Sequence, residues 1–227
     1  YKSYNNYPFS VLDSISLANL GDEFGVIGNE DISSISKGNS YGVELLAQQK
    51  MSSSIYGILS ATYYRSRFED KDGNLISSSW DNRFILNMTA GKKFKNNIEL
   101  GFKYRFSGGS PYTPIDIINS SNKIIWDINQ QAVLDYNLLN TQRLNGSHVL
   151  DIRIDKKWFF KSWGLNAYID IENILSSKTE LPSQYGIDSD LGTIVEGTGE
   201  NSNSYPLYEI INNSGTALPS IGLLIEF

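Results

Sequence analysis

The 227 residues are enough for one sizeable domain or a large part of one. With 40% hydrophobic residues, 19% charged residues, a mean hydropathy of −0.29 and no run of about 18 apolar residues, the sequence excludes a helical membrane protein. The net charge of −6 disfavours nucleic acid as a partner. The absence of cysteine and the single histidine, His148, exclude a disulfide framework and disfavour a metal cluster or a catalytic triad.

Most of the chain alternates apolar and polar side chains with a period of two, which predicts β-strands. A short strand-like stretch at 1–4 precedes seven clearer segments. In chain order these are 41–48, 55–68, 83–90, 98–107, 150–155, 163–172 and 221–227. Both faces of 55–68 are mixed, so its apolar face is not assigned. The segments are roughly as long as tilted membrane-spanning strands, ~9–11 residues.

The polar positions of the later strands carry charges that are expected to line one wall. If 98–107 pairs with 150–155, the residues Glu99, Lys103 and Arg105 lie opposite Asp151, Arg153 and Asp155. Such neighbours form cross-strand ion pairs. The predicted wall therefore consists of Glu99, Lys103, Arg105, Asp151, Arg153, Asp155, Asp170 and Glu172. An acid–base role for Asp151 and Asp155 is disfavoured, because Arg153 lies between them on the same face.

The links between the predicted strands are alternately short and long. Short links lie near 50–54, 94–97 and 159–162, whereas the long ones are 5–38, 69–79, 108–145 and 173–219. Outer-membrane barrels have this asymmetry, with short periplasmic turns and long external loops. A soluble β-sandwich, which is the alternative explanation of the alternation, has no reason to keep all its long loops at one end.

Charge and aromatic residues are sorted in the same way. The long links carry −4, −2, −1 and −5, or −12 together, which leaves +6 on the remainder of a chain whose total is −6. Lysines and aromatic residues gather at the short links, notably Lys92, Phe94, Lys156, Trp158 and Trp163. Aromatic rings beside lysines are typical of a membrane interface.

We therefore expect an antiparallel transmembrane β-barrel, or the last seven to eight strands of a larger one. In hydrocarbon every backbone polar group needs an internal partner, so the sheet must close on itself or on strands outside these residues. The sequence begins at Tyr1 in a strand-like pattern, without an initiator Met or a signal peptide. This start favours a piece of a longer polypeptide over a self-contained small barrel with adhesive or structural duties.

Several short motifs follow one another along the chain. They are Tyr-Gly-Val-Glu at 41–44, Trp-Asp-Asn-Arg at 80–83, Ser-Gly-Gly-Ser-Pro-Tyr-Thr-Pro at 107–114, Asn-Thr-Gln-Arg-Leu at 140–144, Leu-Asp-Ile-Arg at 150–153, Lys-Lys-Trp at 156–158, Tyr-Ile-Asp-Ile-Glu-Asn at 168–173 and the final Phe227. In this order the motifs resemble the C-terminal barrel portion of TonB-dependent outer-membrane receptors of the Bacteroidetes type. The resemblance covers essentially the whole chain, with residues 1–227 as the C-terminal part of one barrel domain.

The resemblance implies a 22-stranded barrel in the bacterial outer membrane, closed by an N-terminal plug, that imports a siderophore, cobalamin, a glycan or a peptide. The implied partners are outer-membrane lipid, the remaining strands and plug, TonB through the N-terminal region, and a surface lipoprotein or substrate at the external loops. Phe227 resembles the aromatic C-terminus recognised by the barrel-assembly machinery. No plug and no energy-coupling box lie within these residues, so they lack the gate.

The remaining candidates lie in the long links. Aromatic side chains give large contact area at low entropic cost, which makes six of them candidates for ligand contact: Tyr112, Trp126, Tyr136, Tyr185, Tyr205 and Tyr208. Asp188, Asp190, Glu196 and Glu200 have the oxygen ligands of a Ca²⁺ site but no known loop spacing. Ser-Gly-Gly-Ser at 107–110 lacks the Lys of a phosphate loop. No enzymatic activity, metal or cofactor is expected.

Overall fold

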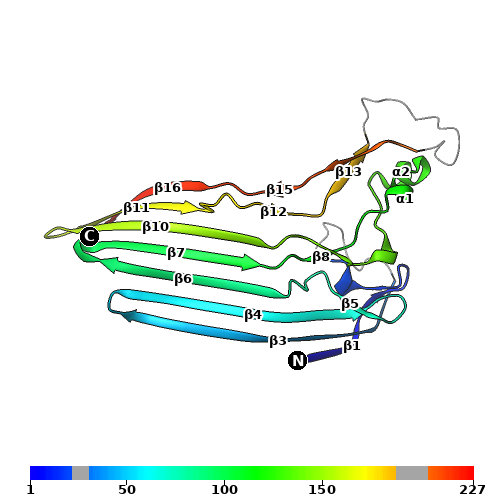
Figure 1. Ribbon diagram of the computed structural model, residues 1–227, viewed down its shortest axis with the longest axis horizontal. Helices are drawn as coiled ribbons and strands as arrows, with labels where there is room; N and C mark the ends of the chain where they lie inside the picture. The colour runs from blue at the N-terminus through cyan, green and yellow to red at the C-terminus, as the bar shows by residue number, and fades with distance from the viewer. Residues whose placement is uncertain (22–30, 188–203) are drawn as a thin grey trace.

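The protein is mostly β-structure, with one large antiparallel sheet of ten strands and few helices (Figure 1). The computed structural model describes residues 1–21, 31–187 and 204–227. The sheet consists of β1 (Lys2–Ser10), β2 (Ile15–Ser16), β3 (Ile32–Ser52), β4 (Ile55–Glu69), β5 (Leu75–Ser77), β6 (Phe84–Phe94), β7 (Ile98–Ser107), β10 (Ser147–Phe159), β11 (Gly164–Glu172) and β16 (Leu218–Glu226).

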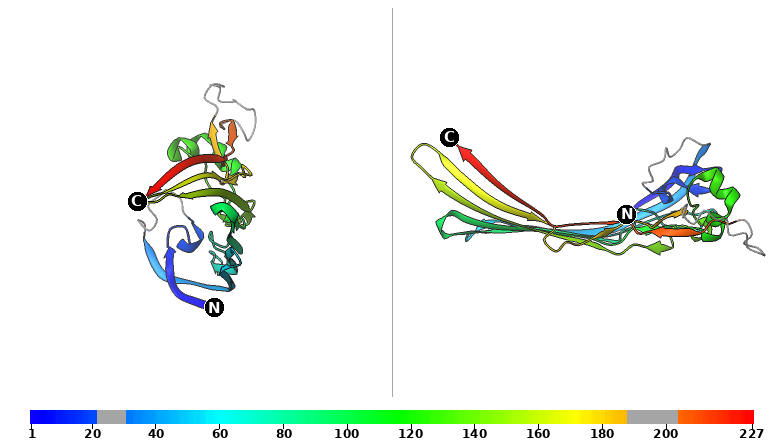
Figure 2. Two further views of the ribbon diagram at one scale, coloured as in Figure 1. Left: turned by 90° about the vertical axis from the view of Figure 1, so that its left-hand side faces the viewer. Right: turned by 90° about the horizontal axis from the view of Figure 1, so that it is seen from above.

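The strands follow one another in the order β16-β11-β10-β7-β6-β4-β3-β1-β2, with β5 paired to β4. Each long strand is therefore hydrogen-bonded to its neighbours along the chain, as in a meander. Within the described residues β16 and the β1–β2 end are open edges, and no closed barrel is formed. Figure 2 shows that the sheet bends into an open trough.

The predicted strands are all present, but several are longer than the alternation indicated. The stretch predicted at 1–4 is the start of β1, which pairs with β3 from Lys2↔Ser40 to Ser10↔Ile32. The long link predicted at 5–38 was therefore too long, because residues 5–10 and 32–38 at its two ends are paired strand. β3 has 21 residues, or roughly 70 Å at the usual rise, so it extends well beyond the length that a membrane requires.

The short and long links lie at opposite ends of the sheet, as predicted (Figure 1). We call these the short-turn end and the long-link end. The β3–β4 turn uses Ser53 and Ser54, both with positive φ, as two-residue hairpins of type I′ require. The β6–β7 turn is the 3-10 segment η2 (Lys95–Asn97), with positive φ at Asn96 and Asn97. Phe227 lies at the short-turn end with them.

The long links carry small elements of their own. These are the 3-10 segments η1 (Leu17–Asn19) and η3 (Tyr136–Leu138), the helices α1 (Ile117–Ser121) and α2 (Lys123–Asn129), and the strands β8 (Pro111–Tyr112), β9 (Gln142–Arg143), β12 (Thr179–Glu180), β13 (Gln184–Ile187), β14 (Leu207–Ile210) and β15 (Asn213–Ser214). Within the described ranges, none of the helices has the length and apolar character needed to cross a membrane.

The sheet has very little hydrophobic core. Only five described apolar residues are buried, and they lie in or near the long links: Ile15, Ala18, Phe68, Trp126 and Leu139. The accessible surface is 14979 Å², compared with about 10,000 Å² for a compact folded protein of this mass. A soluble β-sandwich would bury one face of the sheet against a second sheet, but no such layer covers it in the part of the chain described.

Candidate functional site

The strand register gathers the apolar side chains of seven strands on one face. Directly opposed residues of antiparallel strands point to the same side of the sheet. The pairing therefore shows which residues share one face, which we call the apolar face. Its members are Val43, Leu45 and Ala47 of β3; Ile55, Gly57, Leu59, Ala61 and Tyr63 of β4; Phe84, Leu86, Met88, Ala90, Lys92 and Phe94 of β6; Ile98, Leu100, Phe102, Tyr104 and Phe106 of β7; Leu150, Ile152, Ile154, Lys156 and Trp158 of β10; Leu165, Ala167, Ile169 and Ile171 of β11; and Ile221, Leu223 and Ile225 of β16.

This face is exposed rather than packed. Phe102 in the middle of the sheet is 36% exposed, Ile169 is 49% exposed, and Ile221 on the edge strand is 79% exposed. The register also settles the strand that the sequence left unassigned, since Leu59 and Ala61 of β4 pair with Met88 and Leu86 on this face. An uncovered apolar surface of this extent marks an interaction with another apolar medium or partner.

The opposite face, which we call the polar face, carries a network of charges. Arg105 donates to Asp151 across the β7–β10 pair at 3.0 Å, which confirms one predicted cross-strand ion pair. Arg153 contacts Asp155 at 2.8 Å and Asp170 of β11 at 3.7 Å. The guanidinium of Arg153 also lies 3.9 Å from the centre of the Tyr168 ring.

The register places two pairs of these charged residues directly opposite each other. Asp151 faces Lys103, whereas Asp155 faces another acid, Glu99. The repulsion between these two carboxylates is reduced because Arg153, on the same strand as Asp155, donates two hydrogen bonds to Asp155. Glu99 turns the other way, toward β4 and β6. Glu172, the last member of the predicted wall, is exposed at the end of β11.

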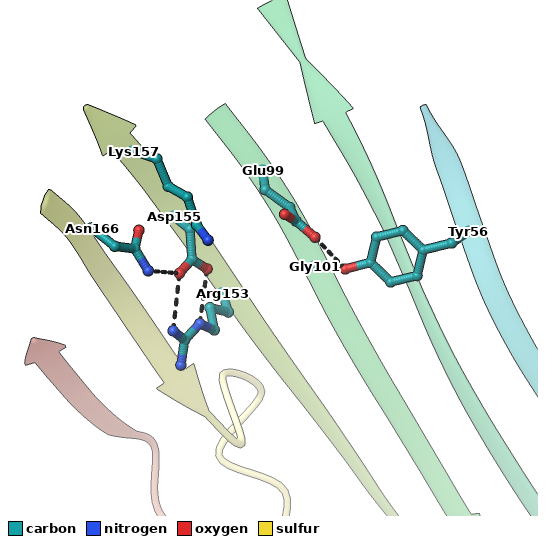
Figure 3. Close-up of a pocket in the computed structure, with 7 residues that line it drawn as sticks. All are labelled: Tyr56, Glu99, Gly101, Arg153, Asp155, Lys157 and Asn166. Atoms are coloured by element: carbon teal, nitrogen blue, oxygen red, sulfur yellow. Dashed lines mark hydrogen bonds and ion pairs between the residues drawn. The ribbon is translucent and has the colours of Figure 1, made fainter. Parts of the chain in front are cut away.

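A shallow pocket of about 320 Å³ lies in this network, near the short-turn end (Figure 3). It is lined by Tyr56, Glu99, Gly101, Arg153, Asp155, Lys157 and Asn166. The Tyr56 hydroxyl donates to Glu99 at 2.6 Å, and Lys93 lies 3.8 Å from the same carboxylate. Asn166 donates to Asp155 at 3.0 Å. Glu99, Arg153 and Asp155, three of the charged lining residues, are thus paired or hydrogen-bonded to their neighbours in this network.

Glycines let tyrosine rings lie flat on the polar face. A Cβ on Gly91 would fall 2.4 Å from the Tyr56 ring, and a Cβ on Gly222 would fall 2.2 Å from the Tyr168 ring. Gly101, which pairs with Gly91, has no atom closer than 4.0 Å. Rings placed over glycines hold register in curved sheets.

A second cluster, at the long-link end, surrounds the buried carboxylate of Asp81. This side chain is fully buried and accepts from Ser77 at 2.8 Å and from the backbone N–H of Ser66 at 2.9 Å. Arg65 lies 3.2 Å away, Arg143 3.4 Å and Arg83 4.0 Å. Burial, and then the nearby Arg83, lower the pKa of Arg143, whereas Asp81 raises it.

The Asp81 cluster joins three long links. Arg143 also donates to the carbonyls of Asp81 and Gly109, which lie in two different links. Asn140 donates to the carbonyls of Asn19 and Ser77 at 2.9 and 3.0 Å. The motifs at 80–83, 107–114 and 140–144, far apart in the sequence, therefore meet in one polar centre that holds the links together.

The six aromatic candidates for ligand contact differ in how far they are exposed. Trp126 is buried, with 6% of its surface exposed, so its ring packs within the link. Tyr205 donates to Asp127 at 2.9 Å, and this hydrogen bond raises the pKa of Tyr205. Tyr136 and Tyr208 are exposed.

Tyr185 and Tyr208 lie on opposite faces of the β13–β14 pair, since Tyr185 pairs with Glu209 and Tyr208 with Gly186. Burial, then Glu209 and Tyr112, raise the pKa of Tyr185. This places Tyr112 and Tyr185 near each other, and ligand contact by these residues stays a prediction.

The acidic group of Asp188, Asp190, Glu196 and Glu200 lies outside the described residues. Across 1–21, 31–187 and 204–227, no group of three or more acidic, His or Cys side chains gathers in a way that suits a metal ion. His148 is exposed at the start of β10. Phe227 is fully exposed just beyond β16.

Sequence reasoning missed the role of Asp81, Asn140 and Arg143. The only signal was their place in the motifs at 80–83 and 140–144, and nothing in either motif indicated that the two would meet. The chain matches no known protein-family model, no curated protein and no solved structure.

Proposed function

We propose that this chain is part of the wall of an outer-membrane β-barrel of the TonB-dependent receptor type, which imports a nutrient into the periplasm. The single observation that carries the proposal is the apolar face, continuous over seven paired strands and uncovered. In water such a surface would be buried or would aggregate. Against lipid it is the favourable arrangement.

The height of the apolar face supports a bilayer as its surroundings. Phe84 and Phe94 stand at its two rims on β6, ten residues apart. Ten residues span roughly 34 Å along a strand, and a tilt of about 35–45° reduces this to roughly 24–28 Å across the membrane. The apolar band of outer-membrane barrels is about 25 Å tall.

The polar face and the two open edges support a wall around a lumen. Ion pairs such as Arg105–Asp151 need water or each other, so this face would not be stable against lipid. The unpaired edges at β16 and β1–β2 would leave backbone groups without partners in hydrocarbon. We infer that further strands complete the ring. The import function, the plug and the energised inner-membrane partner come from the motif resemblance alone.

The proposal is tested by locating the protein in its host cell. An antibody raised against the 108–145 link is used to probe outer-membrane, inner-membrane and soluble fractions. We expect a band in the outer-membrane fraction at a mass several times the 25.4 kDa of this chain, because a plug and many more strands must accompany it. A band of about 25 kDa in that fraction would support a small closed barrel. A band in the soluble fraction would contradict both.

A further inference from the structure

Two charged residues interrupt the apolar face, and both are lysines. Between the Phe84 rim and the short-turn end, Lys92 of β6 and Lys156 of β10 are the only described residues of this face that carry a charge. Within the described part of the chain, no Asp or Glu side chain lies on this face between the same limits. The ion pairs of the neighbouring Lys93 and Asp155 are made on the polar face instead.

The register places these two lysines on either side of β7. Lys92 pairs with Leu100, and Lys156 pairs with Ile98, which lies two residues closer to the short-turn end. Two strand spacings separate their backbones, or roughly 10 Å across the sheet. Both side chains are long enough to reach the surface above β7 between them.

Both ammonium groups lean toward the β6–β7 turn. The Lys92 ammonium lies 5.3 Å from the centre of the Phe94 ring, and the Lys156 ammonium lies 5.5 Å from the centre of the Trp158 ring. Lys156 also donates to the carbonyl of Asn96 in the turn itself. Phe94 and Trp158 belong to the rim of the apolar face, so the charges stand where apolar surface gives way to water.

We propose that this rim is a binding site for the phosphate headgroup of an anionic phospholipid. Lys92 and Lys156 hold the phosphate beside the β6–β7 turn. Leu100, which pairs with Lys92, and Ile154, which pairs with Leu100, contact the acyl chains. Two cations without a nearby carboxylate favour an anion, and the apolar rows below them favour one that carries hydrocarbon. This inference rests on the proposed function, since it requires the apolar face to lie in a bilayer.

The test compares two pairs of lysines that are adjacent in sequence but point to opposite faces. The complete polypeptide is purified in an uncharged detergent with equal amounts of phosphatidylglycerol and phosphatidylcholine, and native mass spectrometry measures how much of each lipid it retains. In the double variant Lys92→Gln, Lys156→Gln we expect phosphatidylglycerol retention to fall about thirtyfold, since two cations near a headgroup together contribute on the order of 2 kcal/mol and about 1.4 kcal/mol corresponds to a factor of ten.

The control double variant, Lys93→Gln, Lys157→Gln, removes the same charge from the polar face and should change retention by less than about twofold. Lys92→Arg with Lys156→Arg should retain the lipid. Equal losses in the two glutamine variants, or no loss in either, would overturn the proposal. Displacement of the lipid by inorganic phosphate at constant ionic strength would also overturn it, because the ligand would then be the free ion.

Flotation with phosphatidylcholine vesicles distinguishes a failure of the headgroup site from a failure of the proposed membrane wall. A protein that floats with vesicles but shows no lysine-dependent lipid retention contradicts only the headgroup site. A complete polypeptide that stays in the aqueous phase contradicts both the headgroup site and the membrane wall on which it depends.

Discussion

Asp81 shows how a single buried charge organises the long-link end. Its carboxylate has no solvent exposure and neighbours three arginines from β4, the β4–β6 link and β9. A buried charge is tolerated only when it is paired and hydrogen-bonded, and both conditions hold here. Because Arg143 also donates to the carbonyls of Asp81 and Gly109, loss of the carboxylate would loosen two links together.

Replacing Asp81 with Asn should weaken the packing of these links by about 3 kcal/mol, the lower end of the cost of breaking a buried ion pair. Hydrogen exchange of peptides from 75–84 and 108–145 should then become up to roughly a hundredfold faster, as about 1.4 kcal/mol corresponds to a factor of ten. Asp72→Asn, an exposed carboxylate in the same link, serves as the control and should leave exchange unchanged. Equal exchange in both variants would mean that Asp81 does not hold the links.

At the scale of the strands, the alternation of apolar and polar side chains predicted which face of the sheet most residues occupy. The faces of β7, β10 and β11 followed from residues such as Phe102 and Asp170, because a period of two leaves no choice of side. Strand ends were less predictable: β3 continues on both sides of 41–48, where Ser, Lys and Gly residues give no alternation. These ends are fixed by pairing with β1 and β4, a tertiary contact that local sequence does not encode.

The register of β4, β6 and β7 can be tested with two glycines that pair with each other. In Gly91→Ala the new methyl group would displace the Tyr56 ring, and loss of the Tyr56–Glu99 hydrogen bond should cost roughly 1–3 kcal/mol of unfolding free energy. Gly101→Ala meets open space and should be neutral. Urea unfolding of the complete polypeptide in vesicles measures both, and equal stabilities would contradict the register.

For the whole molecule, the separation of short and long links was predictable, and it was the most informative feature of the sequence. The site at the long-link end was not, because Asp81, Asn140 and Arg143 come together only through the packing of links that lie far apart along the chain. The aromatic candidates illustrate the same limit. Trp126 was a candidate because of its aromatic ring, yet the structure buries that ring within its own link. Whether an aromatic side chain of a link is buried or exposed depends on tertiary packing.

The central claim, that one face of the sheet lies against lipid and the other against water, is tested most directly by a spin label on adjacent residues. The 227 residues contain no cysteine, so Phe102→Cys and Lys103→Cys each add one labelling site, on opposite faces of β7. In vesicles, we expect the label at 102 to collide mainly with oxygen, which concentrates in lipid, and the label at 103 to collide mainly with a water-soluble nickel chelate. Equal collision with the nickel chelate at both positions would contradict the claim.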